Sequence, residues 1–339
     1  MTDFQADSVD VVATGAVLPE STTMVVVGSS TAQPGDGTPP TREPVRQVFA
    51  SMPLLVKFST IWLILIVGGA IYGKVDQTIF NDALPLQDPN FQTNNFDPRT
   101  GEFGTGEAIE GPSASHWLGT DAIARDTFAR TVHGGWVSLT VAVVAAGFGI
   151  IVGGFLGSLV GFVRGRTEIL IMAGIDVILA FPALILLLAM VSIFRVRSLL
   201  VISLVIGFLS IPAYTRVARA NSLAISNREF VLAARAIGTK PSKILRREII
   251  PNVLPTVLSY AMVAGAFVIV VEGSLSFLGL SVQLPTATWG NMINQARRDI
   301  ELNILQVLVP SLALVFTVLS LNQVGDFFRK RSAFRASAL

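Results

Sequence analysis

The feature that most limits how this chain can fold is a series of long apolar stretches separated by polar segments. A helix that crosses the hydrocarbon core of a bilayer needs about 20 mostly apolar residues. Six stretches approach this length: residues 55–72, 137–162, 169–193, 199–215, 254–278 and 304–322. The sequence therefore predicts an all-α membrane protein with six transmembrane helices and with both termini on the same side of the membrane.

Composition agrees with this class and removes several others. Of the 339 residues, 51% are hydrophobic and 14% are charged, against about 25% charged in soluble domains. The chain has no cysteine and only two histidines, which excludes a disulfide framework, a thiolate metal site and a cysteine nucleophile. The net charge of +2 is too small to favour the binding of nucleic acid. We therefore expect membrane lipid as the solvent, no metal site and no nucleic-acid partner.

The positions of Lys and Arg predict the orientation, because these residues concentrate in cytoplasmic loops. With both termini in the cytoplasm, 17 of the 25 Lys and Arg residues lie inside, and eight of them fall between the fourth and fifth spans. The tails are therefore expected to be cytoplasmic, and the segment between these two spans is expected to carry the main cytoplasmic contact.

The chain divides into segments of different composition. Residues 1–50 are rich in Ser, Thr, Pro and Gly and predict a disordered cytoplasmic tail. Residues 51–72 are expected to form the first transmembrane helix, and residues 73–135 an external loop that ends in an amphipathic helix, Asp121–Thr131, at the membrane surface. The remaining segments are a five-helix core (136–325), the cytoplasmic loop inside it (216–253) and a basic cytoplasmic tail (326–339).

No segment carries the pattern of a nucleotide site or a catalytic site. Gly68, Gly73 and Lys74 have the spacing of a phosphate-binding loop, but Val75 stands where Ser or Thr must bind magnesium. The stretch also ends a predicted membrane helix instead of following a strand. We therefore expect no enzymatic activity, and if the protein uses ATP, another chain must bind it.

Two carboxylates lie inside predicted spans, Asp176 and Glu272. Acids within a membrane often face a cavity or a substrate path, so both are candidates for the translocation path. The alternative is that they lie near the ends of their helices, at the interface or paired with helix termini.

Small residues and prolines indicate how the spans pack. Gly149, Gly153, Gly157 and Gly161 recur at every fourth position and predict a packing ridge along one face of the second span. Proline removes a backbone hydrogen bond and clashes with the preceding turn. The prolines in the third and fourth spans, at positions 182 and 212, are therefore expected to kink or end their helices.

The cytoplasmic segment predicts a helix, a sharp turn and a second helix. Residues 228–237 are rich in Ala and Leu, Gly238 suits the position just past a helix end, and Pro241 suits the first turn of the next helix. Such a hairpin, with cations at its tip, is suited to a groove on another protein. A basic hairpin that lies on anionic lipid is the alternative interpretation.

Four blocks of this chain, in order and in spacing, resemble the permease subunits of bacterial ABC importers of the dipeptide, oligopeptide and nickel family. They are Ala233-Ala234-x3-Gly238 with Pro251, similar to the EAA loop; His116–Asp121 with Arg125-Asp126, similar to the external segment; Asp176–Pro182, similar to the third-span signature; and Glu272–Leu280 with Pro285 and Trp289-Gly290. The long external segment is similar to that of the C-type permease. The chain departs from the family pattern at Leu232, Glu248, Ile250, Ile123-Ala124 and Trp136, which leaves subtype and substrate open.

The resemblance implies a type I importer permease fold in a bacterial cytoplasmic membrane. It implies as partners a second permease, as a hetero- or homodimer, two ABC ATPase subunits that use ATP and magnesium, and an extracytoplasmic substrate-binding protein. No cofactor is expected on this chain itself. The residues that the resemblance assigns to ATPase coupling are Ala233, Ala234, Gly238, Thr239, Lys240, Pro241, Ser242, Lys243, Arg246, Arg247 and Pro251.

Two other function classes remain open at this point. A secondary transporter or channel would show intramembrane charge pairs or an inverted repeat, and a membrane scaffold would need no coupling loop. The cargo is also open among a dipeptide, a longer peptide, a nickel chelate and a glutathione-like molecule.

Overall fold

The computed structural model describes residues 52–80, 88–94, 96–97, 102–103, 107–193 and 198–337. The predicted disordered tail, residues 1–50, lies outside these ranges. The described residues are helical apart from loops and one small antiparallel pair, β1 (Phe96–Asp97) with β2 (Glu102–Phe103). The prediction of an all-α fold is confirmed.

Five helices are long and apolar enough to cross a membrane, and a broken pair completes the six predicted spans. The continuous spans are α2 (Leu54–Val75) with η1 (Asp76–Phe80), α3 (Thr127–Val163), α6 (Leu199–Ile225), α9 (Ile250–Phe277) and α11 (Leu305–Ser337). The broken pair is α4 (Arg166–Ala180) and α5 (Ala183–Ile193), and three short helices join the spans: α7 (Glu229–Ala236), α8 (Pro241–Ile244) with η2 (Leu245–Ile249), and α10 (Trp289–Ala296).

Pro182 breaks the third span. α4 ends at Ala180, Phe181 is extended with φ −88° and ψ 138°, and α5 leaves at an angle of 90°. The residue before a proline is disfavoured in the helical conformation, and the proline cannot donate the next helical bond. Pro212 has a different effect, because α6 passes through it and continues to Ile225.

Several predicted boundaries differ from the structure. No separate amphipathic helix spans Asp121–Thr131: the chain turns until Asp126, whose side chain accepts a bond from the Ala129 N–H at 2.7 Å and so caps the start of α3. The Asp121 carboxylate accepts the Ile123 and Arg125 N–H groups at 3.0 and 2.9 Å. These local bonds favour a turn over a helix.

Helices continue through much of the segment 216–253, which the sequence predicts as a cytoplasmic loop. α6 extends to Ile225, and a single helical run from Pro241 to Phe277 joins α8, η2 and α9. The predicted tail at 326–339 likewise begins as part of α11, which reaches Ser337. Charged residues at helix ends remain solvated while the backbone stays helical, so hydropathy alone ends each helix too early.

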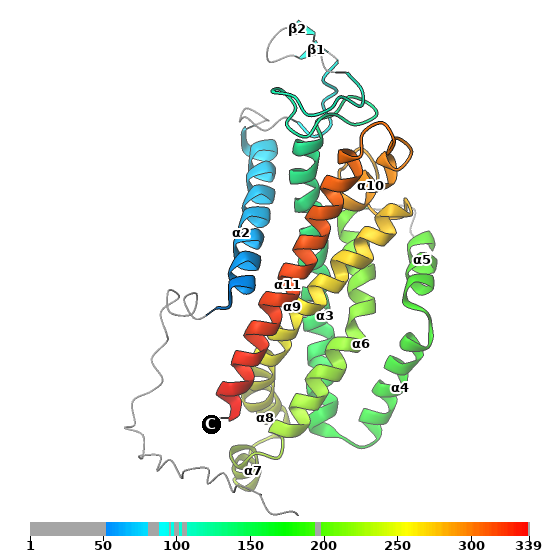
Figure 1. Cartoon of the computed structure of the whole chain (residues 1–339). Coiled ribbons are helices and arrows are strands. Elements are labelled where there is room, and N and C mark those ends of the chain that lie inside the picture. Colours follow the sequence, from blue (N-terminus) through cyan, green and yellow to red (C-terminus); the bar gives the residue numbers. More distant parts are fainter. Residues whose placement is uncertain are drawn as a thin grey trace, which may run out of the picture. The chain divides into compact units, whose positions relative to one another are not determined.

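α3 lies beside α6 (Figure 1), and the glycine ridge of α3 faces α6. A Cβ added at Gly153 would stand 2.7 Å from the Ile211 carbonyl oxygen, and one at Gly161 would stand 2.6 Å from the Arg219 carbonyl oxygen. Gly149 and Gly157 meet Tyr214, Thr215 and Ala218 in the same way. The two backbones approach so closely that only glycine fits, as small residues allow in membrane helices.

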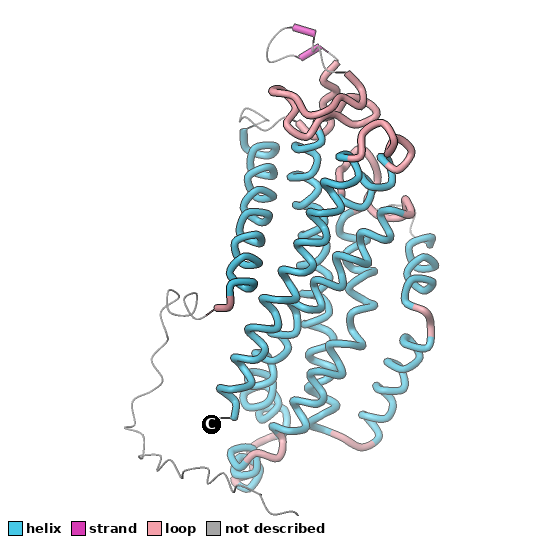
Figure 2. Tube along the Cα trace, in the orientation of Figure 1, coloured by secondary structure: helices cyan, strands magenta, loops and turns pink. Residues whose placement is uncertain are grey.

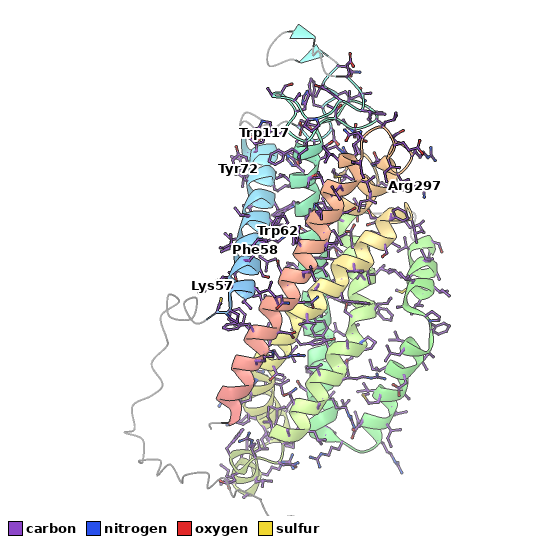
Figure 3. The ribbon with its side chains drawn as sticks, viewed as in Figure 1. Lys57, Phe58, Trp62, Tyr72, Trp117 and Arg297 are labelled. Carbon is purple, nitrogen blue, oxygen red and sulfur yellow. The ribbon has the colours of Figure 1, made fainter. Side chains whose placement is uncertain are left out.

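α2 packs on one side of the bundle through aromatic contacts (Figure 3). The ring centroids of Trp62 and Phe316 lie 5.3 Å apart, and Trp62 Nε1 donates to Thr317 Oγ1 over 3.2 Å. Phe58 also meets Phe316, edge to face. α2 also exposes Leu54, Leu55, Ile64 and Leu65, as expected for a helix in lipid.

Candidate functional site

The short helix α7 ends in a turn that requires glycine. Gly238 has φ +77°, a left-handed conformation that other residues adopt only at a cost of about 1–2 kcal/mol. The Thr239 N–H donates to the Ala234 carbonyl and the Gly238 N–H donates to the Arg235 carbonyl, both over 3.0 Å. This pair of bonds is a Schellman motif, which satisfies the last carbonyls of the helix.

The second helix, α8, begins at Pro241, three residues after Gly238. Pro241 occupies its first turn, and the Lys240 carbonyl accepts bonds from the N–H groups of Lys243 and Ile244. Proline suits this position because its missing N–H would have no helical partner there. The segment 229–244, here called the α7–α8 hairpin, therefore has the predicted order of helix, turn and helix.

The α7–α8 hairpin is fastened to the spans by a buried apolar cluster. Val231 of α7 and Ile244 of α8 are fully buried, together with Ile249, Val253 and Tyr214. Arg235 also lies over the ring of Phe162 near the end of α3, 5.0 Å from its centroid. Residues of α3, α6, α9 and the hairpin share this cluster, so the hairpin is packed into the same apolar core as three of the spans.

The outer face of the α7–α8 hairpin combines apolar and cationic side chains. Leu232 and Ile237 are 50% and 83% exposed, which is unusual for large apolar residues in a segment so rich in charge. Apolar side chains with a charged rim mark an interaction surface more often than plain solvated helix. The exposed cations on the hairpin and on η2 are Arg235, Lys240, Lys243, Arg246 and Arg247.

The other predicted coupling residues lie on or next to the α7–α8 hairpin. Ala234 and Thr239 are half-buried and Pro251 is exposed in the first turn of α9. Ala233, Pro241 and Ser242 are exposed on the hairpin itself.

Asp176 lies on α4 and forms an ion pair that the sequence did not predict. Arg216 of α6 donates to its Oδ1 over 2.8 Å, and both side chains are more than half exposed. A second pair joins the same helices, with Arg219 Nε donating to Glu168 Oε1 over 2.7 Å. These partners could not be found from sequence, because the pairing depends on α4 lying beside α6 after the break at Pro182.

Glu272 has the opposite environment. It is fully buried inside the described part of the chain, and its carboxylate accepts bonds from Ser138 Oγ of α3 at 3.0 Å and Ser281 Oγ at 3.2 Å. Asp176 and Glu272, predicted together as translocation-path candidates, are thus not brought together. Only Asp176 lies on an exposed surface in this conformation, because the serines enclose Glu272 between two spans and the loop after α9.

The phosphate-loop spacing has no matching structure. Gly68 and Gly73 lie inside the continuous helix α2, so the backbone N–H groups that would hold a phosphate are committed to helical bonds. The two histidines have different surroundings. His116 Nδ1 lies 3.2 Å from Asp126 Oδ2, while His133 is buried in α3.

The comparisons with known proteins agree with this arrangement. Residues 149–337 match the family model described as binding-protein-dependent transport system inner membrane component. The match covers more than half of the chain and includes the glycine ridge, the broken span and the α7–α8 hairpin. The protein belongs to this family of membrane permeases, and it is a multi-pass membrane protein.

Curated relatives extend the match outside the family model. The chain is 36% identical over 220 residues to the glutathione transport system permease protein GsiD of Pectobacterium atrosepticum, which covers 65% of this chain and 73% of that one. It is 34% identical over 221 residues to the dipeptide transport system permease protein DppC of Alkalihalophilus pseudofirmus, covering 65% and 72%. A putative peptide permease protein of Brucella suis is 38% identical over 220 residues, covering 64% and 72%.

A solved structure supports the fold. A chain of the MetNI methionine ABC transporter in an inward-facing conformation aligns with a TM-score of 0.51 at 20% identity, covering 60% of this chain and 96% of that chain. This likeness concerns the fold alone. The expected type I importer permease fold is confirmed.

Proposed function

We propose that this chain and a second permease subunit, identical or different, together form the translocation path of an ATP-driven importer. The proposed cargo is a peptide or a related small solute, since the relatives named above are glutathione, dipeptide and peptide permeases. The observation that carries the proposal is the α7–α8 hairpin, which combines a turn fixed by Gly238 with an exposed apolar and cationic face.

The proposed importer needs partner subunits, because the described part of this chain offers no site for ATP. Two separate ATPase subunits bind ATP and magnesium, and one of them receives the α7–α8 hairpin in a surface groove. The hairpin then lies in the cytoplasm with both termini, in agreement with the excess of Lys and Arg on that side. An extracytoplasmic binding protein delivers the cargo to the opposite end, in a bacterial cytoplasmic membrane.

Coupling in this proposal is mechanical. Closure of the ATPases moves the hairpin, and the buried cluster around Val231 and Ile244 transmits the movement to α6 and α9. A two-state element that both sites bias is what allosteric coupling requires. Asp176 lies on the half-helix α4, in the part of the translocation path that changes conformation. Glu272 holds α3 and α9 together at the end of the spans away from the hairpin.

Gly238→Val tests this role. A β-branched side chain disfavours the left-handed turn, and a cost of about 1–2 kcal/mol changes an equilibrium about five- to thirty-fold. We therefore expect uptake to fall by about this factor while the chain still inserts and folds. The measurements are ATP-dependent uptake into proteoliposomes, ATP hydrolysis, and co-purification of ATPase subunits identified by mass spectrometry.

Gly279→Val is the matched control. Gly279 also has a left-handed φ, +74°, and an added Cβ meets nothing within 4 Å at either position. It ends α9 in the same kind of turn, with the Leu280 N–H donating to the Leu275 carbonyl over 3.0 Å and the Gly279 N–H donating to the Ser276 carbonyl over 2.9 Å. The two variants therefore impose similar backbone strain at different turns. Normal uptake in Gly238→Val, or equal losses in both variants, would contradict the coupling role. A folded chain that co-purifies with no ATPase would favour a secondary transporter or a scaffold.

A further inference from the structure

Loops gather at the end of the bundle that carries α10 (Figures 1 and 2). The residues of this end line a cavity of about 390 Å³, whose walls come from the loop before α3, the first turn of α3, α10 with the loop after it, and the first turn of α11. This volume falls within the range of small-molecule sites, about 300–1,000 Å³. The polar residues that matter below are Asp121, Arg125, Thr127, Arg130, Gln295, Arg298 and Gln306.

Two buried guanidinium groups share one carboxylate on this wall. Arg125 Nε donates to Asp121 Oδ2 over 2.7 Å, and Arg130 Nε lies 3.6 Å from the same oxygen. Arg130 is 1% exposed and Arg125 is 5% exposed. Arg298 and Asp299 also line the cavity, so three arginines face two carboxylates and the lining has a formal charge of +1.

Four of the lining residues also have a buried polar atom without a hydrogen-bond partner among the described residues. Two of these atoms are donors, Arg130 Nη2 and Gln295 Nε2. Gln306 Oε1 is an acceptor, and Thr127 Oγ1 can act as either. The Gln295 amide is oriented by Arg125, whose Nη2 donates to its oxygen over 2.8 Å, so its NH₂ group is the free end. Buried polar atoms are nearly always paired, and a group of unpaired ones around a single cavity indicates a ligand.

We propose that this cavity binds a small carboxylate solute. The unpaired donors of Arg130 and Gln295 match a carboxylate, and charge-assisted bonds of this kind are the strong ones. The acceptor on Gln306 suits an amide or ammonium N–H of the same solute. The exposed cation of Arg298 lies on the lining of the cavity and attracts an anion toward it.

A small solute fits the cavity better than an acidic side chain from a docked protein, because a single Asp or Glu side chain would fill little of 390 Å³. The site goes beyond the proposed transport function, and only its placement on the external side rests on the proposed orientation. Binding can therefore be measured without ATP and without transport.

The test uses the full chain in lipid nanodiscs, together with the subunits that co-purify. The probes are glycylglycine and glycylglycine amide, which differ only in the carboxylate, and binding is followed by saturation-transfer NMR and calorimetry. We expect glycylglycine to bind and the amide to bind at least about ten-fold more weakly, since a hydrogen bond to a charged group contributes about 1.5–3 kcal/mol.

Gln295→Glu keeps the oxygen that Arg125 requires but replaces the free donor with a negative charge, so the fold is retained and binding should be lost. Arg298→Gln should weaken binding several-fold. Arg297→Gln is the matched control, because Arg297 is also exposed but lies over the Phe277 ring, 5.7 Å from the centroid, and does not line the cavity.

Three results would overturn the proposal. One is that both probes bind equally well or that neither binds. In that case water is the partner of the unpaired atoms. Another is glycylglycine binding that Gln295→Glu leaves unchanged, which would place the probe elsewhere. The third is an Arg298→Gln variant that binds the probe as well as the unmodified chain does but captures the purified binding protein more weakly. That result would assign the arginines to protein docking.

Discussion

α6 contacts two helices in different ways, and the contrast separates the part of the molecule that must stay fixed from the part that is free to move. Against α3 it packs backbone to backbone along four glycines, with Tyr214 and Ala218 fully buried. Against α4 the pairing residues are charged and partly exposed, as in Arg216 with Asp176. Close-packed interfaces tolerate little displacement, whereas exposed ion pairs contribute little stability.

The broken span belongs to the second kind. Many apolar residues of α4 and α5, among them Ile169, Leu170 and Ile185, are exposed in the isolated chain. With its 90° bend, this span is held to the rest by few buried side chains. The comparison predicts that changes in the α3–α6 interface reduce folding, while changes in the α4–α6 pairs alter transport.

The largest effect is expected at the glycine ridge. Gly153→Ala places a methyl group 2.7 Å from a carbonyl oxygen of α6 and 2.9 Å from the Tyr214 side chain, which forces the helices apart. Overpacking of this kind costs about 1–3 kcal/mol. The thermal unfolding temperature and the folded yield in mild detergent measure it.

The adjacent glycine is the matched control. Gly154 points to a different face, where the nearest atom to an added Cβ is a Val257 methyl at 3.8 Å. Gly154→Ala should be neutral or slightly stabilising, because alanine is the better helix former. If both variants unfold alike, the glycines act through backbone flexibility and not through the α3–α6 contact.

A smaller effect is expected at Glu272, which tests whether a buried acid belongs to the fixed part. Glu272→Leu removes both serine bonds, each worth on average about 0.6 kcal/mol in membrane proteins, and should lower the unfolding temperature. Glu272→Gln keeps an acceptor and should lose less, and Ser138→Ala should lose one bond only. If stability is unchanged but cargo selectivity is altered, Glu272 lines the translocation path and does not belong to the fixed part.

The smallest effect on stability is expected at the ion pairs. Asp176→Arg should change the free energy of unfolding by less than about 1 kcal/mol and yet lower the uptake rate several-fold, since it places two cations between α4 and α6. The double variant with Arg216→Asp restores the pair with reversed charges and should recover uptake. A double variant as slow as the single one would show that Asp176 acts on the cargo directly and not through Arg216.

Regular features of this fold were readable from the sequence. The six apolar stretches, the break at Pro182, the glycine ridge and the hairpin around Gly238 each depend on local chemistry: hydropathy, a missing N–H, a missing Cβ and a left-handed turn. Such features need no knowledge of neighbouring segments. They therefore predicted the fold and the α7–α8 hairpin with little error.

Features that depend on pairing between distant segments were not predictable. The ion pairs of Asp176 and Glu168 require α4 beside α6, and the enclosure of Glu272 requires Ser138 of α3 and Ser281 of the loop after α9. Asp121 was assigned to a helix because its neighbours are amphipathic, but its carboxylate caps a turn instead. The cavity beside Arg130 combines three stretches of chain, 121–130, 292–299 and Gln306, and left no signal in any one of them.

The helical run from Pro241 to Phe277 contains 37 residues, which at 1.5 Å per residue makes a rod of about 55 Å across a hydrocarbon layer of about 30 Å. One end carries the hairpin and the other carries Glu272. In the proposed coupling this rod tilts in the bilayer, and a tilt of one degree shifts one end relative to the other by about 1 Å. The proposed mechanism thus allows a displacement of the hairpin to reach the opposite end of α9 through the helical run itself.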